Sequence, residues 1–210
     1  SELGGIIRYA ETDSLKAELL RFKNYLLRMT ERSGAKIMLG TEADERLVRE
    51  LAPDHIIVAA GSRPKVPTFI SGYELAHDIT DIYFRPETVK GDNIVIIGGG
   101  LSGVEAGLHL RTQGKNVTIV EMAECLMGVG FCYKRGVMYA IGKYGLPMYE
   151  HTSCTEISEK VVKCIDAEGR ELFIPADSVF YGIGMRSDRE LYYRISDLAP
   201  FVDIVGDCRS

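Results

Sequence analysis

Residues 93–121 read NIVIIGGGLSGVEAGLHLRTQGKNVTIVE, and this stretch decides the fold. Its apolar run 94–97 is short and β-branched, which is typical of a strand buried on both faces of a parallel sheet. A glycine-rich turn follows at once, and the apolar residues of 101–113 then recur at helical spacing until Gly114 ends the helix. A second apolar run, 116–120, comes next. The order strand, glycine turn, helix, strand predicts a βαβ unit.

The glycine turn has the spacing G-x-G-x-x-G, formed by Gly98, Gly100 and Gly103. In such a turn the first glycine permits the tight bend, the second lets the backbone approach a pyrophosphate, and the third lets the helix lie close to the strand. The N-terminus of the helix also attracts anions. We therefore expect a dinucleotide pyrophosphate at this turn, with contacts from Gly98, Gly99, Gly100, Leu101, Ser102 and Gly103. The alternative is a turn whose glycines serve packing only.

Glu121 ends the second strand of this unit, where a carboxylate can accept hydrogen bonds from both ribose hydroxyls of an adenosine. A carboxylate repels the 2′-phosphate of NADP, and residues 122–125 contain no Arg or Lys to offset it. NAD is therefore expected in preference to NADP. Met122, the next residue, is an expected neighbour of the cofactor.

Composition excludes several other classes of function. The net charge of −5 and the lack of a basic cluster give no sign of nucleic-acid binding. No apolar run approaches the roughly 18 residues of a membrane span, and the first residues lack a secretory signal, so a cytoplasmic protein is expected. The five cysteines include no C-x-x-C, which argues against a metal site, an iron–sulfur cluster or a redox dithiol in this chain. They are Cys125, Cys132, Cys154, Cys164 and Cys208.

The remaining elements complete an α/β pattern: a Rossmann-like doubly wound parallel sheet with an antiparallel β-meander. Before the glycine turn we expect a helix at 14–33, short elements at 35–39 (strand) and 41–51 (helix or turn), a central strand at 55–60 and a linker at 64–86. After Glu121 we expect a helix at 133–144, a strand at 146–149, a meander at 152–157, 161–166 and 170–174, and strands at 178–183 and 201–207.

Three separated signatures resemble the FAD-dependent pyridine nucleotide-disulfide oxidoreductase superfamily. They are IIVAAGSRP at 56–64, the glycine turn with Glu105, and VDIVGD at 202–207. The usual A-T-G triplet is replaced here by Ala59, Ala60 and Gly61. The segment GGIIRYAETDSLKAELLRFKNYL at 4–26 is similar to the C-terminal part of NADH:flavin oxidoreductases related to 2,4-dienoyl-CoA reductase, trimethylamine dehydrogenase and enoate reductase. VTIVEMAE at 117–124 and YGIGMRSD at 181–188 fit the same group.

The resemblance implies two cofactor domains. It assigns 89–195 to an NAD(H)-binding domain, and 1–88 with 196–210 to a remnant of an FAD-binding α/β domain that lacks its first βαβ unit. Flavin contacts are then expected from Ala60, Gly61, Gly206 and Asp207, and contacts with the nicotinamide half from Glu105 and Gly184. FMN and an iron–sulfur cluster are expected on an N-terminal part of the same polypeptide, which is absent here. The present chain alone is expected to be inactive.

The function implied is hydride transfer from NADH to FAD, with onward reduction of an enoate or dienoyl-CoA type of acceptor. Because the cofactors carry this chemistry, no catalytic acid, base or nucleophile and no metal ligand is expected in the chain. An alternative is a non-catalytic module that holds ADP or NAD as a structural part of a flavoprotein. An S-adenosylmethionine methyltransferase shares the glycine turn and the ribose acid, but it leaves VDIVGD unexplained.

Overall fold

A computed structural model describes residues 2–209 and divides them into two compact units. Unit 1 consists of the described residues up to Gly5, of Lys23–Lys65, and of the described residues from Met185 onward. Unit 2 consists of Ile6–Phe22 and Val66–Gly184. Each unit has its own sheet and its own apolar core.

Unit 2 is built on a five-stranded sheet in the order β3-β10-β4-β5-β6, in which every pairing is parallel. The strands are β3 (Ala76–Asp78), β10 (Ser178–Tyr181), β4 (Asn93–Ile97), β5 (Asn116–Val120) and β6 (Met148–Tyr149). The central strand is β4, and its last residue, Ile97, is in register with Tyr181 on one side and Val120 on the other. The predicted Rossmann-like parallel sheet is confirmed.

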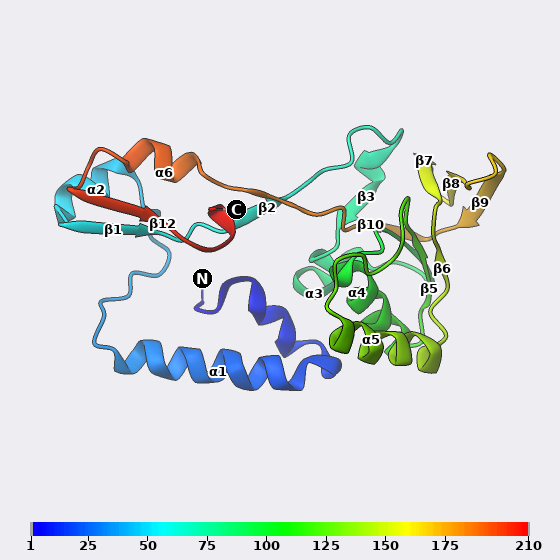
Figure 1. The fold of residues 1–210 in the computed structure, drawn as a ribbon, viewed down its shortest axis with the longest axis horizontal. Helices are drawn as coiled ribbons and strands as arrows, with labels where there is room; N and C mark the ends of the chain where they lie inside the picture. Colours follow the sequence, from blue (N-terminus) through cyan, green and yellow to red (C-terminus); the bar gives the residue numbers. More distant parts are fainter. Residues whose placement is uncertain (1, 210) are drawn as a thin grey trace. The chain divides into compact units, whose positions relative to one another are not determined.

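The alternating side chains of β4 are buried in two different clusters, one on each face of the sheet. Ile94 and Ile96 pack with residues of α4 (Leu101–Thr112) and α5 (Phe131–Tyr144). Val95 and Ile97 pack with residues of a meander formed by β7 (Ser153–Ile157), β8 (Val161–Ile165) and β9 (Glu171–Pro175). Figure 1 shows the two helices and the meander around this sheet. Both faces are covered, which is why the strand sequence is apolar throughout.

Residues 66–88 belong to unit 2 and do not form a free linker. They contain η3 (Tyr73–Leu75), α3 (Asp81–Phe84), η4 (Pro86–Thr88) and the edge strand β3, which pairs with β10. The division by contacts therefore lies near Val66, whereas the sequence placed a cofactor-domain boundary at 88/89. The three-residue strand β3 is too short to give a sequence signal of its own.

Unit 1 has a two-stranded parallel sheet of β1 (His55–Val58) and β12 (Phe201–Ile204). The helices α2 (Glu45–Leu51) and α6 (Glu190–Ile195) complete a small core around Val48, Val58 and Ile195. A bidentate ion pair joins these two helices, since Nε and Nη2 of Arg194 each donate to one carboxylate oxygen of Glu45 at 2.7 Å. The unit also contains β2 (Ser62–Pro64), which pairs antiparallel with β11 (Met185–Ser187), and η5 (Gly206–Cys208).

The predicted N-terminal helix is present as the 3-10 turn η2 (Ser14–Lys16) followed by α1 (Ala17–Arg32), and η1 (Gly5–Glu11) precedes them. None of the helices in 2–209 is long and apolar enough to cross a membrane.

Two strand predictions in unit 1 differ from the structure. Residues 35–39 form no strand, and the side chains of Ile37, Met38 and Leu39 are exposed. An apolar run becomes a strand only when another strand satisfies its backbone groups, and 35–39 pairs with none of the described strands. The run at 55–60 does form β1, but Ile57 is 68% exposed, so it is not a central strand within the described chain.

The carboxylate of Asp177, just before β10, generates a prediction about acid stability. It accepts hydrogen bonds from the N–H groups of Asp92 and Asn93, at 3.1 and 3.0 Å, and from the Nζ of Lys160 at 3.2 Å. The Asn93 N–H, Lys160 and then the Asp92 N–H lower the pKa of Asp177 from 3.8 to about 2. A depressed carboxyl pKa stabilises the fold above the unfolded-state value, and this stabilisation is lost as the pH falls through the folded value.

We therefore expect Asp177→Asn to be less stable than wild type at pH 6, and the difference to shrink as the pH falls from about 4 to about 2. Urea unfolding at several pH values measures this difference. Glu159→Gln removes the same charge from an exposed turn and serves as the control. A difference that stays constant down to pH 2 would contradict the assignment.

Candidate nucleotide-binding site

The glycine turn between β4 and α4 is held by close backbone contacts at its two ends. Gly98 has a φ of +115°, and a Cβ there would lie 2.4 Å from the carbonyl oxygen of Gly182. A Cβ on Gly103 would lie 2.0 Å from the carbonyl oxygen of Gly98. Neither space accommodates a methyl group, so the fold itself requires glycine at both positions.

The two middle glycines of the turn, Gly99 and Gly100, differ in how much space surrounds them. A Cβ on Gly99 would lie 2.3 Å from the Sγ of Cys125, whereas a Cβ on Gly100 would meet nothing within 4 Å. Gly100 is the N-cap residue of α4, has φ −65° and ψ 177°, and brings no side chain to the N–H groups of the first turn. Leu101 and the exposed Ser102 follow it at the start of α4. Contacts within the chain therefore do not explain a glycine at position 100.

Glu121 lies beside this turn because β4 and β5 are parallel neighbours and end at the same edge of the sheet. Its carboxylate accepts hydrogen bonds from the N–H groups of Gly99, at 2.7 Å, and Ala123, at 2.8 Å. The carbonyl of Gly99 accepts in turn from the N–H of Leu126, at 2.8 Å. The turn, the acidic residue and the loop after β5 are thus fixed to one another, and each carboxylate oxygen has lone pairs left for a ligand.

A second acidic residue, Glu150, borders this edge and was not singled out by the sequence. It directly follows β6, the next parallel strand, and its carboxylate accepts from the N–H of Cys125 at 2.7 Å. Burial, then the negative charges of Glu150 and Glu121, raise the pKa of Cys125 to about 12. The position of Glu150 directly after the end of a predicted strand could have marked it as a candidate site residue in the sequence. Met122 lies in the same loop with 69% of its side chain exposed.

Gly184 follows β10, which flanks β4 on the side opposite β5. The chain runs outward from β4 through β5 to β6 and then returns to β10, so the strand order reverses between β4 and β10. In open α/β sheets, ligands bind at the carboxyl ends of strands at such a reversal. The N–H of Gly182 donates to Ile97 at 2.8 Å, and Gly184 has a φ of +101°. Gly184 therefore lies at the same edge as the glycine turn.

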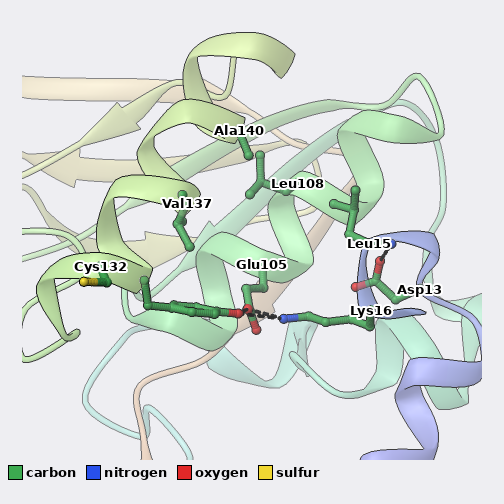
Figure 2. A pocket seen from close by; sticks show the side chains of 10 residues that line it. Asp13, Leu15, Lys16, Glu105, Leu108, Cys132, Val137 and Ala140 are labelled. Atoms are coloured by element: carbon green, nitrogen blue, oxygen red, sulfur yellow. Dashed lines mark hydrogen bonds and ion pairs between the residues drawn. The ribbon is translucent and has the colours of Figure 1, made fainter. Parts of the chain in front are cut away.

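Glu105 occupies a different environment, in a pocket of about 320 Å³ lined by η2, α4 and α5. Its carboxylate forms an ion pair with Lys16 and accepts a hydrogen bond from the hydroxyl of Tyr133 (Figure 2). Burial alone lowers the pKa of Lys16, but the hydrogen bond and charge of Glu105 outweigh it and raise that pKa. The hydrogen bond to Glu105 also raises the pKa of Tyr133. The predicted contact of Glu105 with a nicotinamide stays a prediction.

A buried Asp13–His109 pair places η2 against α4. The carboxylate of Asp13 accepts from the N–H of Leu15 at 2.9 Å and lies 3.4 Å from the Nδ1 of His109. Burial acts to raise the pKa of Asp13, but the neighbouring His109, the hydrogen bond from the N–H of Leu15 and the charge of Lys16 together lower it. This anchor explains how Lys16 reaches Glu105, although the two residues are distant in sequence.

The predicted flavin contacts belong to unit 1, where the structure brings them together. Ala60 and Gly61 follow β1, and Gly206 and Asp207 follow β12, in a register that pairs Val58 with Ile204. Because the two strands are parallel, all four residues lie at one edge of the sheet. Gly61 and Gly206 have φ values of +80° and +69°, and a Cβ on either would meet nothing within 4 Å.

Within 2–209, no group of three or more His, Cys, Asp or Glu side chains is arranged to hold a metal ion.

Comparison with known proteins identifies the family. The model of the pyridine nucleotide-disulphide oxidoreductase family matches residues 7–199. The chain is 32% identical over 178 residues to cinnamate reductase of Clostridium sporogenes, covering 83% of this chain and 26% of that protein. It is 30% identical over 214 residues to NADH oxidase of Thermoanaerobacter brockii, covering 98% of this chain and 32% of that protein. The chain thus spans about a quarter to a third of the length of these relatives.

Among solved structures, a complex of 2-naphthoyl-CoA reductase with 2-naphthoyl-CoA matches with a TM-score of 0.92 and 26% identity, covering 100% of this chain and 32% of that one. The predicted resemblance to enoate and dienoyl-CoA reductase-like flavoproteins is confirmed by these relatives. With a family model that covers nearly the whole chain, the protein belongs to the pyridine nucleotide-disulphide oxidoreductase family.

Proposed function

We propose that this chain binds NADH at the glycine turn and Glu121, and that the complete polypeptide uses it to deliver hydride to FAD. The observation that carries the proposal is Gly100. The glycines at 98, 99 and 103 are explained by contacts inside the protein, whereas the space in front of Gly100 is open. This space lies at the N-terminus of α4, where backbone N–H groups and the helix dipole favour a pyrophosphate.

The acidic residues support NAD over NADP. Glu121 lies at the carboxyl end of β5, where the adenosine ribose of a dinucleotide is expected. The carboxylate of Glu150 accepts a hydrogen bond from the N–H of Cys125 in the loop that follows Glu121. Two carboxylates therefore border the place where a 2′-phosphate would lie. Adding a phosphate dianion there is unfavourable in the absence of a compensating cation.

The role of the protein in hydride transfer is to bind and orient. When bound, NADH supplies the hydride and FAD accepts it, so the chain needs no general acid or base. Glu121 and the glycine turn would hold the adenosine and pyrophosphate, and Glu105 and Gly184 the nicotinamide half. Ala60, Gly61, Gly206 and Asp207 would contact the flavin. The open space at Gly61 and Gly206 fits the close approach of a ligand to the backbone.

The partner of this chain is then the remainder of the same polypeptide, which completes the flavin site and carries FMN and an iron–sulfur cluster. Exposed apolar side chains in unit 1 support such a partner, among them Ile57 on β1, at 68% exposed, and Phe201 on β12, at 62%. The names of two relatives, cinnamate reductase and 2-naphthoyl-CoA reductase, favour a conjugated acid or CoA thioester as the final acceptor.

The first test is calorimetric titration of the chain with NADH, NADPH and ADP. We expect NADH to bind at least about tenfold tighter than ADP, a difference of about 1.4 kcal/mol, because both halves of the dinucleotide are held. In the complete polypeptide, NADH should bleach the flavin absorbance under anaerobic conditions. Equal affinities for ADP and NADH, with no bleaching, would favour a non-catalytic structural module instead.

Substitutions in the turn separate binding from folding. Gly100→Ala should leave the unfolding free energy nearly unchanged and weaken NADH binding by about tenfold or more, because the methyl group blocks the approach of the pyrophosphate. Gly103→Ala should instead destabilise the protein by about 1–3 kcal/mol through its clash with the Gly98 carbonyl.

Gly142→Ala in α5 is the matched control, since a Cβ there meets nothing within 4 Å. Urea unfolding and calorimetry measure the two effects. If Gly100→Ala binds NADH as wild type does, the turn is not the pyrophosphate site.

Glu121→Gln tests the choice of nucleotide. The amide keeps an acceptor for the N–H of Gly99 but loses the charge. We expect NADH affinity to fall by about tenfold or more, which is the order of a hydrogen bond to a charged group. NADPH affinity should stay the same or rise, so the ratio of the two dissociation constants moves toward one. An unchanged ratio would mean that Glu121 does not contact the ribose.

A further inference from the structure

Two of the five free cysteines, Cys154 and Cys164, face each other across the meander. Cys154 on β7 and Cys164 on β8 are direct partners in the antiparallel register, and the register shifts immediately after Cys154. Directly opposed residues of antiparallel strands have Cα atoms about 4.5–5.5 Å apart. A disulfide requires about 4.4–6.8 Å. The backbone therefore already holds the two residues at disulfide spacing.

The two side chains also share one apolar environment. The thiol of Cys154 donates to the carbonyl of Glu156 at 3.9 Å. The neighbouring Cys164 and burial raise the pKa of Cys154, whereas the neighbouring Cys154 lowers the pKa of Cys164. Cys164 is fully buried in the core cluster between meander and sheet, and Cys154 packs against that cluster with partial exposure. Cys154 is therefore the member of the pair that solvent can reach, and Cys164 is its buried partner.

We propose that Cys154 and Cys164 are a redox modification site, at which a low-molecular-weight disulfide oxidises the pair to an intramolecular cross-strand disulfide. Cys154 is a thiol at rest and first loses its proton to solvent. The resulting thiolate attacks one sulfur of the small disulfide, the S–S bond breaks, a mixed disulfide forms, and the small thiolate that leaves takes up a proton. The Cys164 thiolate then attacks the Cys154 sulfur and releases the second small thiol. Two electrons and two protons pass from the protein to the small molecule, and a dithiol reductant reverses the reaction.

The other cysteines lack this arrangement. Cys208 is buried, and its thiol donates to the carbonyls of Val58 and Val205. Cys125 is buried and lies in the loop after β5, outside the described strands, so no cysteine faces it across a ladder. Cys132 is exposed, so it can form a mixed disulfide, but it has no facing strand to present a second cysteine. The register of β7 and β8 thus singles out one pair.

The test treats the native chain with oxidised glutathione, quenches it with acid, alkylates the remaining thiols and maps the peptides by mass spectrometry. We expect a peptide that links Cys154 to Cys164 and is lost on treatment with dithiothreitol, in addition to a glutathione adduct on the exposed Cys132. Cys132→Ser, the matched control, should give the same linked peptide. Both thiols of the pair still reduced after treatment, or a wild-type glutathione adduct that persists on Cys154, would overturn the proposal.

Two variants check the order of the steps. Cys164→Ala should stop at the glutathione adduct on Cys154, because no second thiol resolves it. Cys154→Ser should leave the fully buried Cys164 reduced. If Cys164→Ala does not fold, as judged by circular dichroism, Cys154→Ser and the wild-type peptide map still decide the matter. Modification of Cys164 in Cys154→Ser as fast as that of Cys154 in wild type would contradict the assigned roles.

Discussion

The contact between Gly98 and Gly103 is the constraint on which the rest of unit 2 depends. An ideal Cβ at position 103 would lie 2.0 Å from the Gly98 carbonyl oxygen, so α4 rises directly out of the turn that ends β4. This closeness places Val104 and Leu108 in the same buried cluster as Ile96. The helix can lie flat on the sheet only because the two backbones touch at this point.

The contact between Gly98 and Gly103 also determines which groups lie together at the carboxyl edge of the sheet. Once α4 lies against β4, its N-terminus points to the carboxyl end of the sheet, where β5 and β10 end on either side. Gly99 is then held by its N–H to Glu121 and by its carbonyl to Leu126. The acidic residue is therefore fixed by the backbone before any ligand arrives. Such preorganisation lowers the entropic cost of binding, and it leaves Glu121 with a structural role besides its proposed contact with a ribose.

The sequence predicted the structure correctly where an element forms from residues that are close together in the chain. The strand, turn, helix and second strand at 93–121 form from neighbouring residues, and β5 and α4 begin where their patterns indicated. It failed where a partner far along the chain decides the outcome. The apolar run at 35–39 lacks a neighbouring strand, and β3 exists because β10 lies beside it. Nothing in the local sequence of Lys16 or Glu105 indicates that they pair.

The cysteines illustrate the same limit at the level of register. The sequence contains no C-x-x-C motif, and the spacing of its cysteines therefore argued against a redox dithiol. The irregularity between Cys154 and Glu156 shifts the register of β7 against β8, and the pattern of alternating side chains does not reveal such a shift. A one-residue change of register would separate the two sulfurs onto opposite faces. The pairing thus follows from how the strands meet.

The two units differ in how firmly their glycines are held. In unit 2 the turn is fixed by backbone contacts at Gly98 and Gly103, and it follows the central strand of a sheet that is covered on both faces. In unit 1, Gly61 and Gly206 have open space around them and follow a two-stranded sheet with a small core. A two-stranded sheet is marginal by itself, so its loop ends are the less rigid part. The proposed nucleotide edge is therefore fixed by backbone contacts within unit 2, whereas the proposed flavin edge in unit 1 has open space at both of its glycines.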